Sequence, residues 1–114
     1  MEIRHSKSVN GKGLFIKNTY KKNDIVHVLN GEVLDSPTRE SIHVGNNKHI
    51  LDKFGIFMNH SFNPNTEIRG YDVIAIKDIN PDDELTFNYN VSEINMASPF
   101  TVNGIDVSGK SINN

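Results

Sequence analysis

The sequence contains no cysteine, which excludes disulfides, thiolate nucleophiles and zinc sites built from cysteine ligands. No apolar stretch has the length needed to span a bilayer, and the opening MEIRHSKSVNGKG lacks an apolar signal-peptide core. Basic residues are scattered, and the formal net charge is -2, which argues against a nucleic-acid binder. We therefore expect an intracellular protein that neither contacts nucleic acid directly nor inserts into a membrane.

Long helical periodicity is also absent, and short apolar runs of period two recur between turn signals. These runs cover residues 13–18, 24–34, 42–52 and 71–79. Residues 45–47 (GNN) predict a hairpin turn, and residues 80–84 (NPDDE) predict another. Residues 36–41 have helix-start chemistry and predict at most one helical turn. The 114 residues thus predict one mainly β domain, whose last stretch, 91–114, loses the alternation and is expected to be mobile or to need a partner.

Three short stretches carry candidate chemistry. The glycines of GKGLF let a backbone approach a ligand closely, or they simply make the start of a strand flexible. NHSFNPN concentrates polar side chains around Asn59 and His60, either for a ligand or as an Asx-rich turn that caps its own backbone. DELTFNY carries Phe87 and Tyr89 on one strand face, where a tyrosine is either functional or half-buried core.

In this order, the three stretches resemble the SET domain, the fold of S-adenosylmethionine-dependent protein-lysine methyltransferases. The joining segments TYKKNDIV and VIAIKDINPDDELTFNY share the resemblance, which runs from Glu2 to Asn90. It implies a mainly β fold of several short curled sheets, with a knot-like crossing of the NHS strand and the C-terminal segment. Residues 1–91 would form the SET core and residues 92–114 a degenerate post-SET-like tail.

The resemblance also implies a role for each site residue. Tyr89 would be the catalytic phenol, while Phe57 and Phe87 would line the substrate channel, and phenylalanine at 87 favours more than one methylation. The cofactor S-adenosylmethionine would be bound by Lys12, Gly13, Leu14, Asn59, His60, Tyr89 and Phe100, with Gly11 beside them. A neutral lysine amine attacks the methyl group directly, so neither a metal nor a carboxylate base is required. His43 and His49 are expected to be surface or half-buried structural residues.

The sequence departs from the family pattern at several positions. Phe62 stands where the family has cysteine, Asn88 where aspartate is common, and Ile56 where many members have arginine. Val102, Gly104 and Val107 fall near positions that hold zinc-binding cysteines in related tails. The tail would therefore be ordered by packing, by substrate or by a second subunit. The small viral SET proteins, which also lack the zinc segment, make a homodimer the expected assembly.

The substrate would be a lysine-bearing protein, such as a histone tail or another basic protein. The acidic run around Asp82 and Asp83 would attract a basic peptide, or it is only a solvated turn. The location would be cytoplasmic, or the host nucleus if the source is viral or the protein is an effector. One alternative is a catalytically inactive scaffold or peptide-binding module. Another is a methyltransferase that works only after assembly with a larger partner.

Overall fold

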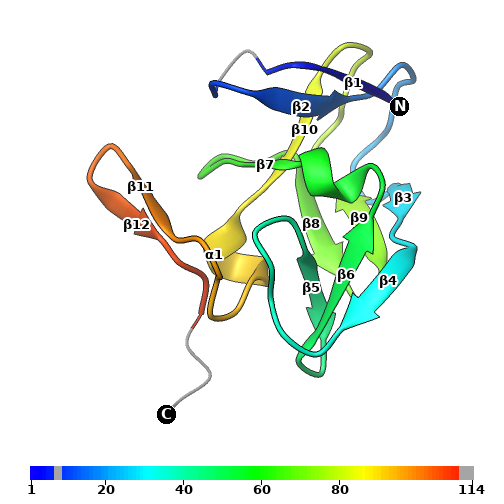
Figure 1. Ribbon diagram of the computed structural model, residues 1–114. Helices are drawn as coiled ribbons and strands as arrows, with labels where there is room; N and C mark the ends of the chain where they lie inside the picture. The colour runs from blue at the N-terminus through cyan, green and yellow to red at the C-terminus, as the bar shows by residue number, and fades with distance from the viewer. Residues whose placement is uncertain (7–8, 111–114) are drawn as a thin grey trace.

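The computed structural model describes residues 1–6 and 9–110, which form several small β-sheets with little helix (Figure 1). The first sheet has the strand order β1-β2-β10-β7. Its strands are β1 (Glu2–His5), β2 (Lys12–Phe15), β10 (Glu84–Phe87) and β7 (Asn59–His60). β10 runs antiparallel to β2 and parallel to β7, with Phe87 opposite His60. This sheet therefore joins the three stretches of candidate chemistry, and the prediction of a mainly β fold is confirmed.

Two three-stranded sheets make up the rest of the body. One has the strand order β3 (Ile25–Val28), β9 (Asp72–Ala75) and β8 (Thr66–Arg69). The other has the strand order β4 (Gly31–Leu34), β6 (Lys48–Asp52) and β5 (Ile42–Gly45). The predicted hairpin turn between β5 and β6 is confirmed, with Asn46 and Asn47 both at positive φ. The run 24–34 was predicted as one strand. It forms two strands of different sheets, β3 and β4, with the buried Leu29 between them.

The side chain of Asp52, the last residue of β6, bonds the loops that follow β3 and β6. Its side chain is only 3% exposed. One carboxylate oxygen accepts from the backbone N–H of Asn30 at 2.9 Å. The other accepts from the N–H groups of Phe54 (2.9 Å) and Gly55 (2.7 Å) and lies 2.9 Å from Nε2 of His27. One buried carboxylate thus satisfies the backbone of two loops.

Helix is confined to two short elements, the 3-10 turn η1 (Gly55–Phe57) and α1 (Tyr89–Ser92). The prediction of a helical turn within 36–41 is wrong. There the hydroxyl groups of Thr38 and Ser41 accept each other's backbone N–H, at 3.2 and 2.8 Å, and form a closed loop. Helix instead begins at Tyr89, where the side chain of Asn88 caps the N–H of Asn90 at 2.9 Å.

Residues 80–84 form a turn, as predicted, but not a hairpin. The N–H of Asp83 donates to the carbonyl oxygen of Asn80 at 3.1 Å, and Asp82 has a positive φ of 71°. The segments on either side do not pair with each other, because Ile79 pairs with Tyr20 and β10 pairs with β2 and β7. The turn therefore passes the chain from one sheet to the next.

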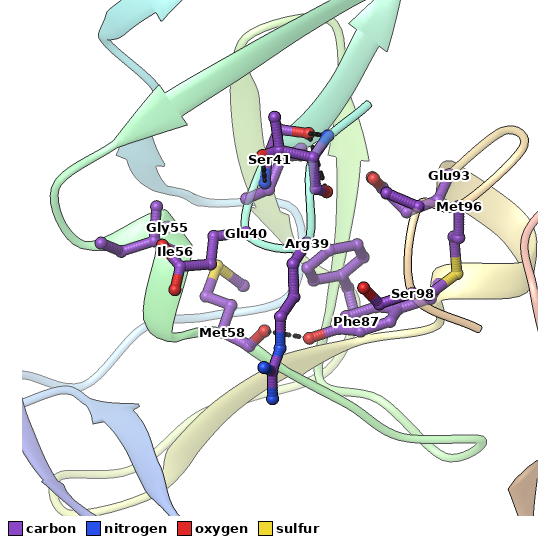
Figure 2. A pocket seen from close by; sticks show the side chains of 14 residues that line it. Arg39, Glu40, Ser41, Gly55, Ile56, Met58, Phe87, Glu93, Met96 and Ser98 are labelled. Atoms are coloured by element: carbon purple, nitrogen blue, oxygen red, sulfur yellow. Dashed lines mark hydrogen bonds between the residues drawn. The ribbon is translucent and has the colours of Figure 1, made fainter. Parts of the chain in front are cut away.

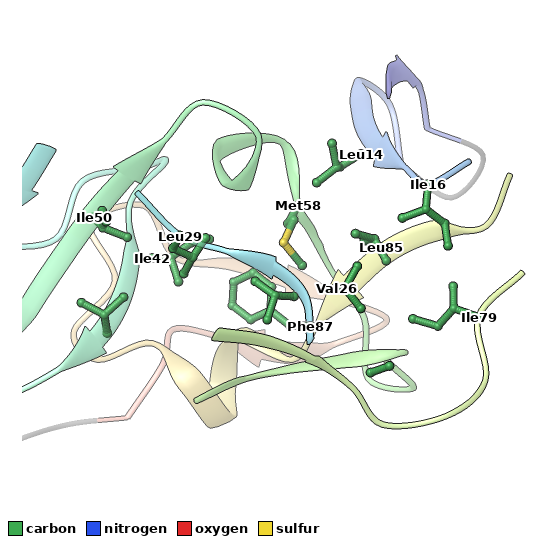
Figure 3. Packing of buried hydrophobic residues seen from close by; sticks show 13 residues of the cluster. Leu14, Ile16, Val26, Leu29, Ile42, Ile50, Met58, Ile79, Leu85 and Phe87 are labelled. Carbon is green, nitrogen blue, oxygen red and sulfur yellow. The ribbon is translucent and has the colours of Figure 1, made fainter. Parts of the chain in front are cut away.

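The hydrophobic core lies where the sheets converge (Figure 3). Its buried members come from all three body sheets and from the loops between them: Leu14, Ile16, Val26, Leu29, Ile42, Val44, Ile50, Met58, Val73, Ala75, Ile79, Leu85 and Phe87. Phe87 is 2% exposed and ends β10. The strand that leads to Tyr89 is therefore held rigidly by packing.

The tail contains regular structure, which corrects the expectation drawn from its weak alternation. β11 (Phe100–Val102) and β12 (Ile105–Val107) form an antiparallel hairpin that projects from the body (Figure 1). Its turn is Asn103-Gly104, both at positive φ. Residues 111–114 of the predicted mobile stretch lie outside the described residues. Among the helices of the described residues, none is long and apolar enough to cross a membrane.

Several contacts fasten this hairpin to the body, including the hydrogen bond from the N–H of Met96 to the carbonyl oxygen of Ser108 at 3.0 Å and the ring contacts of Phe100 with His60 and Tyr89. Lys110 forms a parallel β-bridge with Ile94. The side chain of Asn90 in α1 donates to the carbonyl oxygen of Asp106 at 2.9 Å and accepts from two backbone N–H groups after β12, those of Ser108 and Gly109. The hairpin is thus joined to the helix that begins at Tyr89, while the knot-like crossing stays a prediction.

Candidate functional site

An open cleft of about 1010 Å³ lies between the first sheet and the β11–β12 hairpin. Five of the residues expected to bind the cofactor line it, and they come from four elements: Lys12, Asn59, His60, Tyr89 and Phe100. Phe57 lines this cleft as well. Gly13 and Leu14 are absent from the cleft wall, since Leu14 is fully buried in the core between β1 and β10. The exposed Gly11 does not line the cleft either.

The polar side chains of NHSFNPN bond mainly to other strands and not to their own turn. Nδ2 of Asn59 donates to the carbonyl oxygen of Lys12 at 2.9 Å and to Glu84 Oε2 at 2.7 Å. The amide of Asn65 bonds the backbone of β10 at both its donor and its acceptor. Only Ser61 caps locally, through its hydroxyl and the N–H of Asn63. These bonds therefore fasten the edge strand β7 to its neighbour β10 and, through Asn59, to the backbone of β2.

Gly13 is needed because the Glu84 carboxylate fills the space beside it. A Cβ at residue 13 would overlap Oε2 of Glu84 and lie 3.2 Å from Nδ2 of Asn59. We expect Gly13→Ala to lower the free energy of unfolding by about 1–3 kcal/mol, as for other overpacked sites, in urea titrations. In a Glu84→Asp background, the shorter side chain makes room and the cost should shrink. An equal cost in both backgrounds would contradict the steric explanation.

His60 is held neutral within a group of aromatic rings. Its Nδ1 accepts from the backbone N–H of Tyr89 at 3.1 Å, so the proton sits on Nε2. Nε2 is buried without a hydrogen-bond partner among the described residues. The rings of Phe62, Tyr89 and Phe100 pack edge-on at 4.4, 5.3 and 6.1 Å. Burial lowers the pKa of His60, so a neutral N–H donor is available beside the cleft.

Tyr89 lies where the cleft meets a second, smaller pocket. Its hydroxyl donates to the carbonyl oxygen of Met58 at 2.5 Å, and its ring lies 4.7 Å from that of Phe87. Burial raises the pKa of the phenol, and the carboxylates of Glu93 and Glu84 raise it further. The phenol therefore stays protonated at neutral pH and acts as a hydrogen-bond donor.

The smaller pocket has a volume of about 30 Å³, and Figure 2 shows its lining. Its apolar lining includes Met58, Phe87, Tyr89 and Met96, while Phe57 is not among its lining residues. The two residues expected to form one substrate channel therefore face different spaces. This volume holds a small group or the end of a narrow chain.

Glu93 also lines this smaller pocket, although sequence reasoning did not identify it as a site residue. It is 5% exposed, and its Oε2 accepts from the N–H of His43 at 2.8 Å. Burial raises its pKa to about 7. The only signal available in the sequence was its spacing of four residues from Tyr89, which puts both side chains on one side of a helical turn.

His43 and His49 are part of the structure around this carboxyl. Nδ1 of His43 donates to the carbonyl oxygen of Ser92 at 3.0 Å, and its ring lies 5.2 Å from that of His49. His43 is half-buried, as expected, but His49 is fully buried, which corrects that expectation. Burial, with His43 nearby, lowers the pKa of His49. Within residues 1–6 and 9–110, no group of three His, Asp or Glu side chains is arranged to hold a metal ion.

The residues that depart from the family pattern have clear positions. Phe62 packs on His60, Asn88 caps α1, and Ile56 lines both the cleft and the small pocket. In the tail, Val102 lines the cleft and Val107 is fully buried. Apolar packing thus occurs at two of the positions where related tails bind zinc.

Comparisons with known proteins identify the family. A family model for the SET domain matches residues 16–90, which is more than half of the chain. A crystal structure of a candidate histone methyltransferase from Plasmodium falciparum is similar, with a TM-score of 0.63 and 26% identity over 80% of this chain and 97% of that one. No curated protein matches the sequence. SET-domain proteins are usually protein-lysine methyltransferases that use S-adenosylmethionine. With its several small sheets and this match, the chain belongs to the SET-domain family.

Proposed function

We propose that this chain is an S-adenosylmethionine-dependent protein-lysine N-methyltransferase. The observation that carries the proposal is that Tyr89 lines both the open cleft and the small pocket. A methyl donor bound in the cleft and an amine entering from the small pocket would meet beside its phenol. The reaction is a direct displacement, in which the amine nitrogen bonds to the methyl carbon as the sulfur–carbon bond breaks.

The residues of the cleft fit S-adenosylmethionine, which when bound supplies an electrophilic methyl group on a sulfonium. The volume of about 1010 Å³ accommodates a ligand of nucleoside size. The Nε2–H of His60, which is buried and has no hydrogen-bond partner within residues 1–6 and 9–110, supplies a donor beside the cleft that its residue lines. Phe62 and Phe100, each 41% exposed, offer apolar faces to an adenine ring, and Lys12 offers a cation to a carboxylate.

The chain's own groups would prepare the lysine for transfer. A free lysine has a pKa near ~10.4 and is mostly protonated at neutral pH. The apolar surface of Phe87, Met58 and Met96 disfavours the ammonium form by desolvation. The carbonyl oxygen of Met58 and the hydroxyl of Tyr89 lie together at the junction, where they can orient the amine and the methyl group.

The substrate would be a lysine of a basic protein such as a histone tail, since the similar Plasmodium falciparum structure is that of a candidate histone methyltransferase. Phe87, which lacks a hydroxyl to hold water beside the amine, supports the addition of more than one methyl group. The assembly would be a homodimer, and light scattering on the purified protein reads it directly.

Calorimetric titration of S-adenosylmethionine tests the proposal without knowledge of the substrate. We expect saturable binding to the unaltered protein and about tenfold weaker binding to Asn59→Ala, the effect of losing one polar contact of about 1.4 kcal/mol. Asn63→Ala, in the same segment but outside the cleft lining, is the matched control. If the folded protein takes up no S-adenosylmethionine, the methyltransferase proposal fails in favour of a scaffold or of a site completed by a partner.

A further inference from the structure

The small pocket contains a buried carboxyl beside the phenol that the proposed reaction uses. Tyr89 is the first residue of α1 and Glu93 is its C-cap, and the N–H of Glu93 donates to the carbonyl oxygen of Tyr89 at 2.8 Å. Side chains four residues apart on a helical turn are neighbours. Figure 2 shows Glu93 at the wall of the pocket, across from Met58 and near Phe87.

Only one of the two carboxylate oxygens of Glu93 is engaged. Oε2 accepts from the N–H of His43, and no hydrogen bond to Oε1 occurs within the part of the chain that the structure describes. Oε1 is not among the buried side-chain atoms that lack a partner, so it stays accessible and can accept a hydrogen bond from a ligand in the pocket. The pocket has room for the end of a narrow chain, so an ammonium group fits both its shape and its charge.

The charged and titratable groups around Glu93 leave it as the buried anion of this pocket. They are His43 on β5, His49 on β6, Tyr89 on α1, and Arg39 and Glu40 in the segment before β5. Arg39 and Glu40 are exposed to solvent, and His43 and Tyr89 already donate to backbone carbonyl groups. An incoming ammonium would therefore find one accessible carboxylate oxygen, Oε1 of Glu93, at the wall of the pocket.

We propose that Glu93 is the proton acceptor for the substrate lysine, which rests on the function proposed above. Its carboxylate pairs with the ε-ammonium in the small pocket and takes one proton, so that a neutral amine and a carboxylic acid lie beside Tyr89. The amine lone pair then bonds to the methyl carbon, and the electrons of the sulfur–carbon bond stay on sulfur as the neutral thioether leaves. The product is a methylated ammonium, and the proton on Glu93 returns to solvent.

The acid strength of the carboxyl suits this role. Burial raises the pKa of Glu93 to about 7, so near neutral pH the group is present in both forms and can exchange a proton. Because only the carboxylate form of Glu93 accepts the proton, we expect methyl transfer to increase as the pH rises through about 7. This limb of the pH profile should be absent in Glu93→Gln.

The pairing can be tested with n-butylammonium, which carries the end of a lysine side chain. The chain has three methionines, and two of them, Met58 and Met96, line the small pocket, while Met1 does not. With carbon-13 methyl labels on methionine, n-butylammonium at pH 8 should shift the Met58 and Met96 signals and leave that of Met1 in place. We expect the affinity to fall at least about tenfold in Glu93→Gln, the loss of one charge-assisted contact. n-Pentanol, a neutral analogue of similar length, should bind both proteins alike.

Glu93→Gln keeps an oxygen for the N–H of His43, and the same change at Glu32, which is exposed on β4 and lines neither pocket, is the matched control. Glu32→Gln should bind n-butylammonium like the unaltered protein. Equal affinity in Glu93→Gln, or no shift of Met58 and Met96 in the unaltered protein, would overturn the proposal. Calorimetry with S-adenosylmethionine on the same samples separates the two ideas. If the protein binds n-butylammonium but not S-adenosylmethionine, the ammonium site at Glu93 stands and the methyltransferase proposal fails.

Discussion

Tyr89→Phe is expected to lower kcat for methyl transfer about a hundredfold, the usual effect of removing one positioned hydrogen-bond donor from an active site. The phenol hydroxyl lies at the junction of cleft and small pocket, bonded to the carbonyl oxygen of Met58. Its ring contacts with His60 and Phe87 would be kept by phenylalanine. The affinity for S-adenosylmethionine should therefore change less than about threefold, since the lost group acts in the transition state.

This result is measured with radiolabelled S-adenosylmethionine and a mixture of core histones. Tyr71→Phe is the control, because Tyr71 is exposed and lies in the turn between β8 and β9, away from both pockets. If Tyr89→Phe retained full activity while Tyr71→Phe also did, the assignment of the phenol would be wrong. Loss of cofactor affinity together with activity would instead show that the hydroxyl supports the shape of the cleft.

Asp52→Ala should lower the free energy of unfolding by about 3–5 kcal/mol, because it removes a buried charge that several donors require. The substitution leaves the N–H groups of Asn30, Phe54 and Gly55 without an acceptor. For a domain of this size, we expect the Tm to fall by roughly 10–20 °C. Calorimetric unfolding measures the loss, and a change in Tm no larger than that of the surface variant Asp35→Ala would contradict it.

The same carboxyl gives stability a defined dependence on pH. Burial raises the pKa of Asp52, but the hydrogen bonds from Asn30, Gly55, His27 and Phe54 outweigh burial and hold the pKa below its ordinary value. The folded state thus binds the proton less tightly than the unfolded chain does. The stabilisation is present above the pKa of the unfolded carboxyl and is lost as the pH falls below about 4. Asp52→Ala should flatten this acid limb of the stability profile.

The local turn chemistry of the fold could be predicted from the sequence. Gly45-Asn46-Asn47 indicated the β5–β6 hairpin because two asparagines tolerate positive φ. Asn103-Gly104 carries an equally direct hairpin signal between FTV and IDV, and the tail hairpin was missed because its three-residue strands are too short for alternation to register. Short strands are therefore predicted better from the residues of their turns than from the alternation of apolar and polar side chains.

Contacts between distant segments could not be predicted in the same way. The motifs that contain Asn59 and Tyr89 were recognisable, yet the partner of Asn59 is Glu84, 25 residues away, and that of Glu93 is His43, 50 residues away. Nothing local to Glu84 or Glu93 distinguishes a buried, bonded carboxylate from a solvated one. Likewise, the sequence does not show whether Leu14 faces the cleft or the core. Leu14 lies in the core because β2 pairs with β1 along one edge and with β10 along the other.

The bonds of Asn90 to the β11–β12 hairpin, which are among several contacts that attach it, connect one wall of the cleft to the residue after the phenol. Asn90 follows Tyr89 directly, and its side chain holds the backbone on both sides of Val107. A ligand in the cleft that contacts Phe100 therefore contacts a hairpin that is bonded to Asn90, the residue after Tyr89. We expect cofactor occupancy and phenol alignment to change together, so that the amine meets an aligned phenol only when the methyl donor is already bound.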